Sequence, residues 1–476
     1  MKASLWAMIV EGWLPRAAAV RPERVALQTP DGAVSYAELL AGANANAAEL
    51  AVRGAGPGRR VAIALPPGLA FARALHACLL LGAIAVPIDL RLTAAERERL
   101  TTGAVVLVDE PLALCADRGG TDRYATASHD LESTAVVIHT SGTTSQPKPI
   151  ELTYGNFLWG ALGSAVALGL DPRGRWLCAL PLSHVGGLSI LLRSTIYATT
   201  AVVHERFDTD AVLEALVEQE ITLVSLVATT LGRLLDAMPA HPERPPALRC
   251  ALTGGGPVAP ALIARARKMG VPVSLTYGLT ECCSQVTTTP VAALDDASTQ
   301  PPSAGPPLFC TRVRIVDPSA DTQATLRVGQ EGEILVAGPT VSPGSLAGDG
   351  WLHTGDLGVI DEDGRLHVTG RKADTIVSGG ENVAPAEVEA VLEAHPDVLE
   401  AAVVPRADEQ WGEVVTAIVV TRSGTVPDGE ALRAHCARGL AAHKVPKQVS
   451  FAHGPLPRNR SGKLLRKELL VRTGEQ

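Results

Sequence analysis

Along the first 300 residues, two kinds of apolar pattern alternate. Apolar residues that repeat on one helical face predict helices over residues 36–52, 71–81 and 209–218. Short runs rich in Val, Ile, Leu and Ala predict strands at residues 61–65, 83–88, 105–108, 176–180, 201–203 and 221–227. Because strands that alternate with helices usually pair in parallel, we expect mostly parallel sheets covered by helices on both faces.

The pattern changes after about residue 300. Short apolar runs at 312–316, 333–336, 357–360 and 366–368 predict an antiparallel sheet or a distorted β-barrel, with Asp363-Gly364 as a hairpin turn. Further on, strands are expected at 375–378, 398–404 and 414–420, and helices at 385–393 and around residues 432–440. We therefore predict an α/β chain with a large N-terminal domain at residues 1–370 and a small, mobile α+β domain at residues 371–476.

Composition and charge narrow the class of protein. The chain has 476 residues, 46% hydrophobic and 19% charged, as is typical of a soluble protein with more than one domain. Its net charge of −8 argues against general binding of nucleic acid or of an anionic membrane. The longest apolar run, residues 77–88, is too short to cross a bilayer, and the N-terminus lacks a signal-peptide layout. We expect a cytoplasmic protein.

The eight cysteines predict neither a metal site nor disulfides. They form no Cys-x-x-Cys pair, and no Cys/His group has the spacing of zinc ligands. Cys282 and Cys283 are adjacent, which strains a bridge between them. We interpret most of the cysteines as small core residues in a reducing compartment.

A hydroxyl-rich loop follows the strand-like run 136–138. From Thr140 it contains hydroxyls, one glycine and, after a proline, Lys148. Small hydroxyl residues with free backbone N–H groups can surround phosphate oxygens, and a lysine adds positive charge for a polyphosphate. The loop does not match the Walker pattern, and a polar surface turn is the alternative.

Four further patches have chemistry of the same kind. Residues 253–257 are a glycine-rich turn after an apolar run and leave room for a flat ring. Residues 277–281 offer an aromatic face, a hydroxyl and a carboxylate, and Thr354-Gly355-Asp356 forms a turn before the hairpin. Gly370-Arg371 and Gly462-Lys463 supply cations. Each patch alone has a structural explanation, as a turn, a solvated carboxylate, an Asx cap or a frayed terminus.

In this order and at these separations, the patches resemble the adenylate-forming superfamily of acyl-CoA synthetases, peptide-synthetase adenylation domains and luciferases. The resemblance covers essentially the whole chain. It implies an ATP-dependent acid–thiol ligase that uses Mg²⁺ and coenzyme A, and a C-terminal domain that rotates between adenylation and thioester formation. A homodimer is expected from the resemblance only.

The resemblance also implies roles for individual residues. The phosphate-binding loop would comprise Thr140, Ser141, Gly142, Thr143, Thr144 and Lys148. The adenine pocket would be lined by Gly254, Gly255, Gly256 and Pro257, with Tyr277 stacked on the ring. Thr280 would contact the α-phosphate, Glu281 would bind Mg²⁺, and Asp356 and Arg371 would hold the ribose. Lys463 would bridge the attacking carboxylate and the α-phosphate, and Gly379 and Gly380 would face the pantetheine channel.

Within the superfamily, residues 180–193 and 277–288 resemble the o-succinylbenzoate–CoA ligases of menaquinone biosynthesis. That acid has two carboxylates, so its site needs a cation for the carboxylate that is not activated. The implied acid-binding residues are His184, Arg193, Gly278, Ser284, Gln285 and Thr287. Arg193 is the candidate cation, and an arginine that extends from a buried helix to solvent is the alternative. His184 would be a catalytic gate beside the adenylate or, alternatively, a core histidine.

Two other functions stay open at this point. One is another aryl- or acyl-CoA ligase with the same mechanism. The other is a nucleotide-binding homologue without catalysis, because Ser145, Pro149 and Ala373 depart from the superfamily's usual residues. Pro149 removes a backbone donor close to the loop, and Ala373 stands at a hinge position where many members have Asp or Lys.

Overall fold

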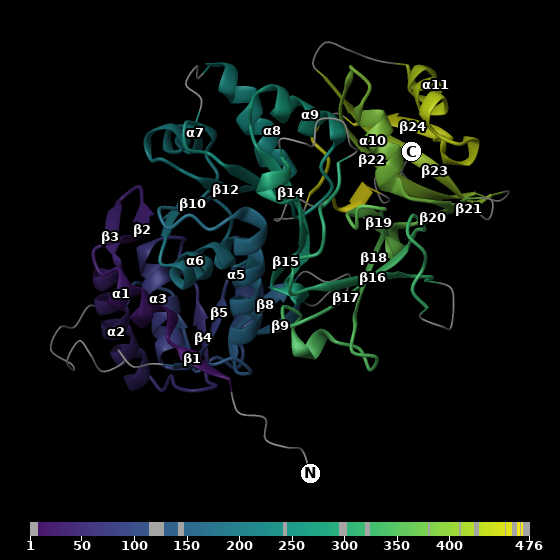
Figure 1. Cartoon of the computed structure of the whole chain (residues 1–476). Coiled ribbons are helices and arrows are strands. Elements are labelled where there is room, and N and C mark those ends of the chain that lie inside the picture. Colours follow the sequence, from purple (N-terminus) through teal and green to yellow (C-terminus); the bar gives the residue numbers. More distant parts are fainter. Residues whose placement is uncertain are drawn as a thin grey trace.

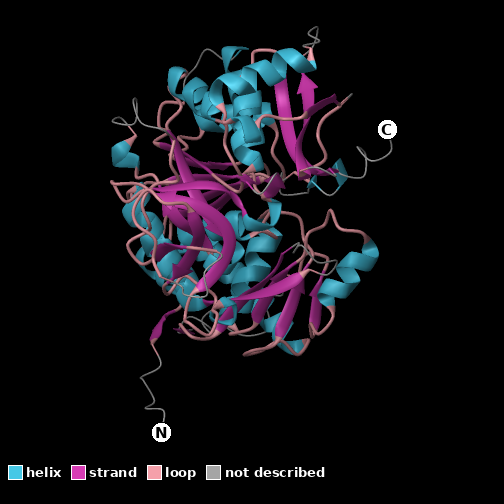
Figure 2. Ribbon diagram, turned by 90° about the vertical axis from the view of Figure 1, so that its right-hand side faces the viewer, coloured by secondary structure: helices cyan, strands magenta, loops and turns pink. Residues whose placement is uncertain are grey.

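The protein is represented by a computed structural model of the whole chain. The structure describes residues 8–113, 128–140, 147–240, 245–294, 302–318, 324–378, 381–408, 411–422, 428–452, 454–458, 464–466 and 468–469. The figures show the arrangement of its elements in two views (Figures 1 and 2).

The largest sheet of the described residues has eight strands in the order β15-β14-β13-β12-β10-β11-β2-β3. Pairing is parallel from β14 to β2 and antiparallel at both edges. The strands are β2 Val25–Thr29, β3 Gly32–Ser35, β10 Arg175–Cys178, β11 Thr200–Val203, β12 Leu223–Leu226, β13 Cys250–Thr253, β14 Val273–Leu279 and β15 Ser284–Thr288. The helices that follow its central strands are α6 Val185–Tyr197, α7 Thr209–Glu218, α8 Ala228–Ala237 and α9 Pro260–Lys268.

A second sheet has the order β6-β4-β5-β8-β9, parallel except for the last pair. Its strands are β4 Arg60–Ile63, β5 Ile84–Pro87, β6 Val106–Val108, β8 Thr134–Thr140 and β9 Lys148–Thr153. The N-terminal helices are α1 Trp13–Val20, α2 Tyr36–Val52, α3 Leu69–Leu80, α4 Ala94–Thr101 and α5 Tyr154–Leu168, and a short ribbon pairs β1 Ile9–Glu11 with β7 Ser128–Asp130. One apolar core joins α1, α2, α3, α5 and α6 to both sheets. The predicted helix-covered parallel sheets are therefore confirmed.

The third sheet is antiparallel, as predicted. Its order β16-β17-β18-β19 is built from β16 Arg312–Val316, β17 Gly332–Ala337, β18 Leu352–Ile360 and β19 Leu366–Arg371. These strands and β15 share an apolar core. The four strands form an open sheet in the described residues, so the distorted barrel stays a prediction. Gly364 has φ +74° in the predicted hairpin turn. The prediction of a turn at residues 354–356 was wrong, because β18 begins at Leu352 and includes them.

A small separate C-terminal domain has its own sheet and core. Its elements are β20 Ile376–Ser378, β21 Glu381–Val383, α10 Pro385–Glu393, β22 Val398–Asp408, β23 Gly412–Thr421, α11 Gly429–Gly439 and β24 Gln448–Phe451. In Figure 1 it lies at the upper right, next to β19. The boundary at residue 370 stays a prediction. Figure 2 shows the strands grouped in separate sheets with helices beside them. None of the helices in the described residues combines the length and apolar character that a bilayer crossing requires.

Two buried histidines predict acid sensitivity of the N-terminal core. His129 Nε2 accepts a hydrogen bond from the Trp13 backbone N–H (3.2 Å), and His76 Nε2 lies 3.3 Å from the Thr195 hydroxyl. Burial lowers the pKa of each imidazole from 6.5 to about 4. The folded state therefore holds both rings neutral, while the unfolded chain takes up protons below pH 6.5.

The stability contributed by the two neutral rings is complete above pH 6.5 and is lost as the pH falls toward 4. At pH 5 the loss should be about 2 kcal/mol per histidine. Urea unfolding of the wild type at pH 7 and pH 5 measures it. The variant His129→Gln should lose less stability between pH 7 and pH 5 than the wild type does. An equal loss in both proteins would contradict the role of His129 in the acid sensitivity.

Candidate active site

The two described ends of the predicted phosphate loop belong to β8, a strand parallel to its neighbour β5, and to the following strand β9. Thr140 ends β8 and Lys148 begins β9, and the two residues are paired across the hairpin. The Thr140 hydroxyl donates to the Lys148 carbonyl oxygen at 3.4 Å. Ser141, Gly142, Thr143 and Thr144 lie outside the described residues. The ends of the hairpin are therefore placed at the carboxyl end of a parallel sheet, the usual location of ligand sites in α/β folds.

Ser342 connects this hairpin to Glu281. The Ser342 hydroxyl donates to the Glu151 carbonyl oxygen on β9, and the Ser342 N–H donates to the Glu281 carbonyl oxygen, both at 2.7 Å. Ser342 is 1% exposed. Sequence analysis missed this residue, because its contact with Glu151 spans 191 residues of the chain. It brings the predicted metal ligand close to the predicted phosphate loop.

Glu281 and Thr280 lie in a short 3₁₀ helix, Thr280–Cys282, directly after β14. Both are half-buried. Among the described residues, the Glu281 carboxylate has no ion pair or hydrogen-bond donor. A carboxylate with its oxygens available suits Mg²⁺, which is usually bound by one or two carboxylates together with substrate phosphates. The donor set therefore fits the metal that the resemblance implies.

Tyr277, Asp356 and Arg371 form one network at the predicted ribose position. The Tyr277 hydroxyl donates to Asp356 Oδ2 at 2.8 Å, and Arg371 Nε lies 2.8 Å from Asp356 Oδ1. Burial and the Asp356 carboxylate hold the pKa of Tyr277 well above 10, so its hydroxyl keeps the proton that it donates. Asp356 is only 4% exposed. The network fixes the ring and the carboxylate together, whereas stacking of Tyr277 on adenine stays a prediction.

The glycine-rich turn after β13 has the open backbone that a flat ring needs. The Gly254 N–H donates to the Leu226 carbonyl oxygen at 3.2 Å, and a Cβ on Gly254 would lie 2.7 Å from Thr276 O. Gly255 has φ +81°, which favours glycine. Gly256 and Pro257 are exposed. The turn is therefore tied to the sheet at its start and open to solvent at its end.

Gly278 allows two strands to approach unusually closely. The register of β14 and β15 shifts between Tyr277 and Gly278, and a Cβ on Gly278 would lie 1.6 Å from the Ser284 carbonyl oxygen. Two consecutive non-glycine residues at the start of β15 have positive φ: Cys283 at 53°, just before the strand, and Ser284 at 96°, its first residue. Such a backbone is strained and persists only where its surroundings hold it.

The variant Gly278→Ala should therefore disturb the whole turn that carries Thr280 and Glu281. We expect a loss of about 1–3 kcal/mol of stability, because the strand must move away from Ser284. Catalytic efficiency should fall by ~10²-fold, since a displacement of about 1 Å can cost that much. Urea unfolding and steady-state kinetics measure the two effects. Gly348→Ala, where a Cβ meets nothing within 4 Å, is the control, and equal behaviour of the two variants would contradict the interpretation.

Arg193 is a buried cation without a protein counter-ion in the part of the chain that the structure describes. It is 3% exposed, which excludes the alternative of a side chain extended to solvent. Its Nη2 is buried and has no hydrogen-bond partner among the described residues, and burial lowers the pKa of the guanidinium. The guanidinium carbon lies 5.8 Å from the centre of the Trp176 ring. Because an unpaired buried charge is costly, this arrangement favours an anionic ligand.

Arg193 lies against the strained turn. A Cβ built on Gly160 of α5 would be 4.0 Å from Arg193 Nη2 and 3.6 Å from the Cys283 carbonyl oxygen. The small residue thus lets the guanidinium and the turn approach the same point on α5. The cysteines of the turn, Cys282 and Cys283, are buried free thiols, as predicted.

The polar residues of β15 differ in what they can still bind. Gln285 Nε2 donates to the Thr288 hydroxyl at 2.8 Å, while its buried Oε1 has no partner among the described residues. The Thr287 hydroxyl already donates to the Ala304 carbonyl oxygen at 2.8 Å. Contacts of Ser284, Gln285 and Thr287 with an acid stay predictions, and Thr287 has only acceptor capacity left.

His184 lies next to Asp89 and Arg91, two residues that sequence analysis missed. His184 precedes α6, and its Nε2 lies 3.3 Å from Arg91 Nη2 and 3.8 Å from Asp89 Oδ2. Burial opposes ionisation of Asp89, but hydrogen bonds and charge from Arg91 outweigh it and lower the pKa of Asp89. Asp89 and Arg91 follow β5, so the carboxyl ends of both parallel sheets meet at this histidine. The sequence signal that could have identified Asp89 and Arg91 is an Asp-x-Arg motif just after a buried strand.

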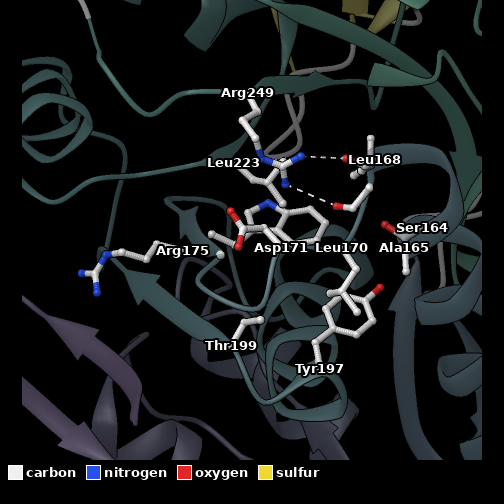
Figure 3. A pocket seen from close by; sticks show the side chains of 13 residues that line it. Ser164, Ala165, Leu168, Leu170, Asp171, Arg175, Tyr197, Thr199, Leu223 and Arg249 are labelled. Carbon is white, nitrogen blue, oxygen red and sulfur yellow. Dashed lines mark hydrogen bonds between the residues drawn. The ribbon is translucent and has the colours of Figure 1, made fainter. Parts of the chain in front are cut away.

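A cavity of about 20 Å³ opens at the opposite end of the large sheet (Figure 3). It lies beside Thr199, Leu223 and Arg249, at the amino ends of β11, β12 and β13. The Arg249 guanidinium donates to the carbonyl oxygens of Leu168 and Gly169 at 3.2 and 3.3 Å and so caps the end of α5. Its lining includes Trp176, whose ring lies near the Arg193 guanidinium, but none of the residues predicted to bind ATP or the acid.

Three other predicted residues, Gly379, Gly380 and Lys463, lie outside the described residues. Their predicted roles therefore stay predictions. The described residues on either side of Gly379 and Gly380 are Ser378, which ends β20, and Glu381, which begins β21.

Known proteins resemble the chain over nearly its whole length. The 2-succinylbenzoate–CoA ligase of Bacillus licheniformis is 38% identical over 486 residues, which cover 96% of this chain and 98% of that protein. The o-succinylbenzoate coenzyme A synthetase of Bacillus subtilis, solved in complex with ATP and magnesium ion, is 37% identical, with 97% and 100% coverage and a TM-score of 0.86. A double mutant of the Bacillus subtilis enzyme, bound with its product analogue OSB-NCoA, is 36% identical, with 97% and 98% coverage and a TM-score of 0.69.

Family models match both parts of the chain. Residues 14–346 match the AMP-binding enzyme family, and residues 387–463 match the AMP-binding enzyme C-terminal domain. Together with the relatives, these matches confirm the resemblance to adenylate-forming enzymes. The chain belongs to the AMP-binding enzyme family.

Proposed function

We propose that this chain is an ATP-dependent ligase that converts o-succinylbenzoate to its coenzyme A thioester, a step of menaquinone biosynthesis. The observation that carries the choice of acid is Arg193, a buried guanidinium without a counter-ion among the described residues. The two similar enzymes named for this acid support the same choice. A dicarboxylate supplies one carboxylate for activation and a second one for Arg193.

In the first step, an oxygen of the activated carboxylate attacks the α-phosphorus of ATP, and the bond to pyrophosphate breaks. Negative charge approaches negative charge, so cations must neutralise it. In our proposal Lys463 bridges the carboxylate and the α-phosphate, Thr280 contacts the α-phosphate, and residues 140–148 surround the pyrophosphate. Glu281 would hold Mg²⁺, which supplies further charge neutralisation when bound. Asp356, held by Tyr277 and Arg371, would accept hydrogen bonds from the ribose hydroxyls.

In the second step, the thiol sulfur of coenzyme A attacks the acyl carbonyl carbon, its proton is lost, and AMP leaves. This step needs no further nucleotide chemistry, so Lys463 is not required for it. In our proposal the C-terminal domain turns between the two steps, about a point close to its predicted start at residue 371, and brings Gly379 and Gly380 to the pantetheine arm. His184, whose imidazole contacts Arg91 and Asp89, would lie beside the acyl group as a gate.

A mass-spectrometric screen tests the substrate. Purified protein is incubated with ATP, Mg²⁺, coenzyme A and a panel of aromatic and aliphatic acids, and acyl-CoA products and pyrophosphate are measured. The proposal predicts the o-succinylbenzoate thioester as the main product. A preference for a monocarboxylate would identify another acyl-CoA ligase of the same mechanism. Absence of pyrophosphate with every acid would identify a catalytically silent homologue, the alternative that Ser145, Pro149 and Ala373 raised.

We further propose a cytoplasmic homodimer. ATP and coenzyme A are cytoplasmic substrates, and the described cysteines are all free. Leu162, Val166 and Leu170 form an exposed apolar line along and just beyond α5 and are 39%, 67% and 53% exposed, which suits a contact with a second copy. Cell fractionation tests the location. Light scattering of the wild type and of Val166→Glu tests the dimer, and a wild-type monomer would refute it.

A further inference from the structure

The two residues on either side of Ala373 are attached to different domains. Lys372 precedes Ala373 in the short 3₁₀ helix Lys372–Asp374. Its Nζ donates to the Pro318 carbonyl oxygen at 3.1 Å and lies 3.4 Å from Glu333 Oε2 on β17. Glu333 is 7% exposed. Lys372 is therefore bound to the N-terminal antiparallel sheet.

Asp374 follows Ala373 and is attached to the C-terminal domain. Its Oδ2 lies 3.6 Å from Arg466 Nε. Arg466 also binds the Glu389 carboxylate of α10 and donates to the Val403 carbonyl oxygen of β22 at 2.9 Å. Burial opposes the charge of Arg466, but its acidic partners outweigh burial and raise its pKa. Asp374 is therefore held by a guanidinium that is itself fixed in the core of the small domain.

Solved relatives differ in how well they superpose on this structure. Over 97% of this chain, the TM-score is 0.86 with the ATP–magnesium complex of the Bacillus subtilis enzyme and 0.69 with the OSB-NCoA complex of its double mutant. Both are forms of one protein with one fold. The structure of this chain is therefore more similar overall to the ATP–magnesium complex than to the OSB-NCoA complex.

We propose that Lys372 and Asp374 are domain clamps that confine the rotation between the two domains to Ala373. This proposal rests on the two-step reaction proposed above but not on which acid is used. The contacts of Lys372 are all with the N-terminal sheet, and the contact of Asp374 is with the small domain. Both sets of contacts therefore persist when the domains turn. The φ and ψ angles of Ala373 absorb the change. The clamps are positioning residues: they define two orientations sharply without touching a substrate.

Single-molecule fluorescence resonance energy transfer tests the clamps without relying on activity. Fluorophores are attached at the exposed positions Glu98 on α4 and Arg438 on α11 of the full-length protein. The wild type should show narrow distance distributions. Lys372→Met and Asp374→Asn should each broaden them, because the rotation then spreads over neighbouring residues. Lys372→Arg and Asp374→Glu should restore narrow distributions.

Changing Lys372 and Asp374 leaves their partners intact. Glu333 also accepts from the Gly355 N–H at 3.3 Å, and Arg466 holds Glu389, so changes at those residues would disturb more than the clamp. The control variants are Lys268→Met on α9 and Asp236→Asn, whose carboxylate pairs with Arg265 on the surface. Neither control should change the distributions.

Kinetics provide the second measurement. Each clamp variant should lower turnover by ~3- to 10-fold, the size of effect typical of positions that couple two sites without contacting either ligand. The KM for ATP should stay unchanged. Distributions of unchanged width in both clamp variants would overturn the proposal. A raised KM for ATP with unchanged turnover would also overturn it, since the residues would then act on the nucleotide site. If the substrate screen finds no o-succinylbenzoate thioester, the distance distributions can still be interpreted, because they do not depend on which acid is used.

Discussion

Replacement of Lys463 by alanine is expected to slow formation of the acyl-adenylate by ~10²- to 10³-fold, the usual cost of removing one group that stabilises developing charge. The proposed reaction places the lysine between an attacking carboxylate and the α-phosphate, so its charge matters most in the transition state. The effect should therefore appear in kcat as well as in kcat/KM. Single-turnover assays of pyrophosphate release, with enzyme in excess and without coenzyme A, measure it.

The second half-reaction supplies an internal control for Lys463→Ala. Acyl-adenylate made chemically and added with coenzyme A should react at the wild-type rate, because no phosphate is attacked in that step. Lys268→Ala, on the exposed surface of α9, should leave both half-reactions unchanged. Full-speed adenylation by the Lys463 variant would refute the role of the lysine, and equal slowing of both half-reactions would indicate a structural effect instead.

Helices with strong local signals could be predicted from the sequence almost to the residue. Helices α2, α7 and α10 have the predicted bounds. In α2, Ser35 and Glu38 form a capping box, and in α10, Pro385 occupies the first turn. These signals are local, so they do not depend on how distant segments pack.

Strand β18 shows why other features could not be predicted. Residues 352–356 contain histidine, glycine and aspartate, which locally indicate a turn. They extend the strand because Thr354 donates to the Ile334 carbonyl oxygen and Gly355 to the Glu333 carboxylate of the neighbouring strand. The same reason explains why Ser342 was missed, since its contacts exist only after the sheets have assembled. Asp89 and Arg91 bind each other locally, but their contact with His184 also depends on that assembly. A single sequence contains no direct record of such contacts.

The burial of Arg193 gives the acid-binding proposal its sharpest test. Replacement by methionine keeps much of the side-chain volume and removes the charge. If the guanidinium binds the second carboxylate of o-succinylbenzoate, kcat/KM for that acid should fall by ~10²-fold or more, because losing one partner of a buried charge pair typically costs about 2–5 kcal/mol. Activity with benzoate-type acids, which lack the second carboxylate, should change little.

Stability should move in the opposite direction. Without substrate, Arg193 is a desolvated cation with no counter-ion among the described residues, so Arg193→Met should leave the free energy of unfolding unchanged or raise it. Arg249→Met is the matched control at the other end of the sheet. It removes the cap of α5 and should lower stability by about 1 kcal/mol while keeping activity.

The two variants therefore separate binding from structure. Arg193→Met is expected to lose activity with o-succinylbenzoate without losing stability, and Arg249→Met is expected to do the reverse. If Arg193→Met unfolds more easily and turns over every acid equally poorly, the arginine is a structural residue. The second carboxylate must then be bound elsewhere, and Gln285, whose buried Oε1 is an acceptor, cannot supply the missing positive charge.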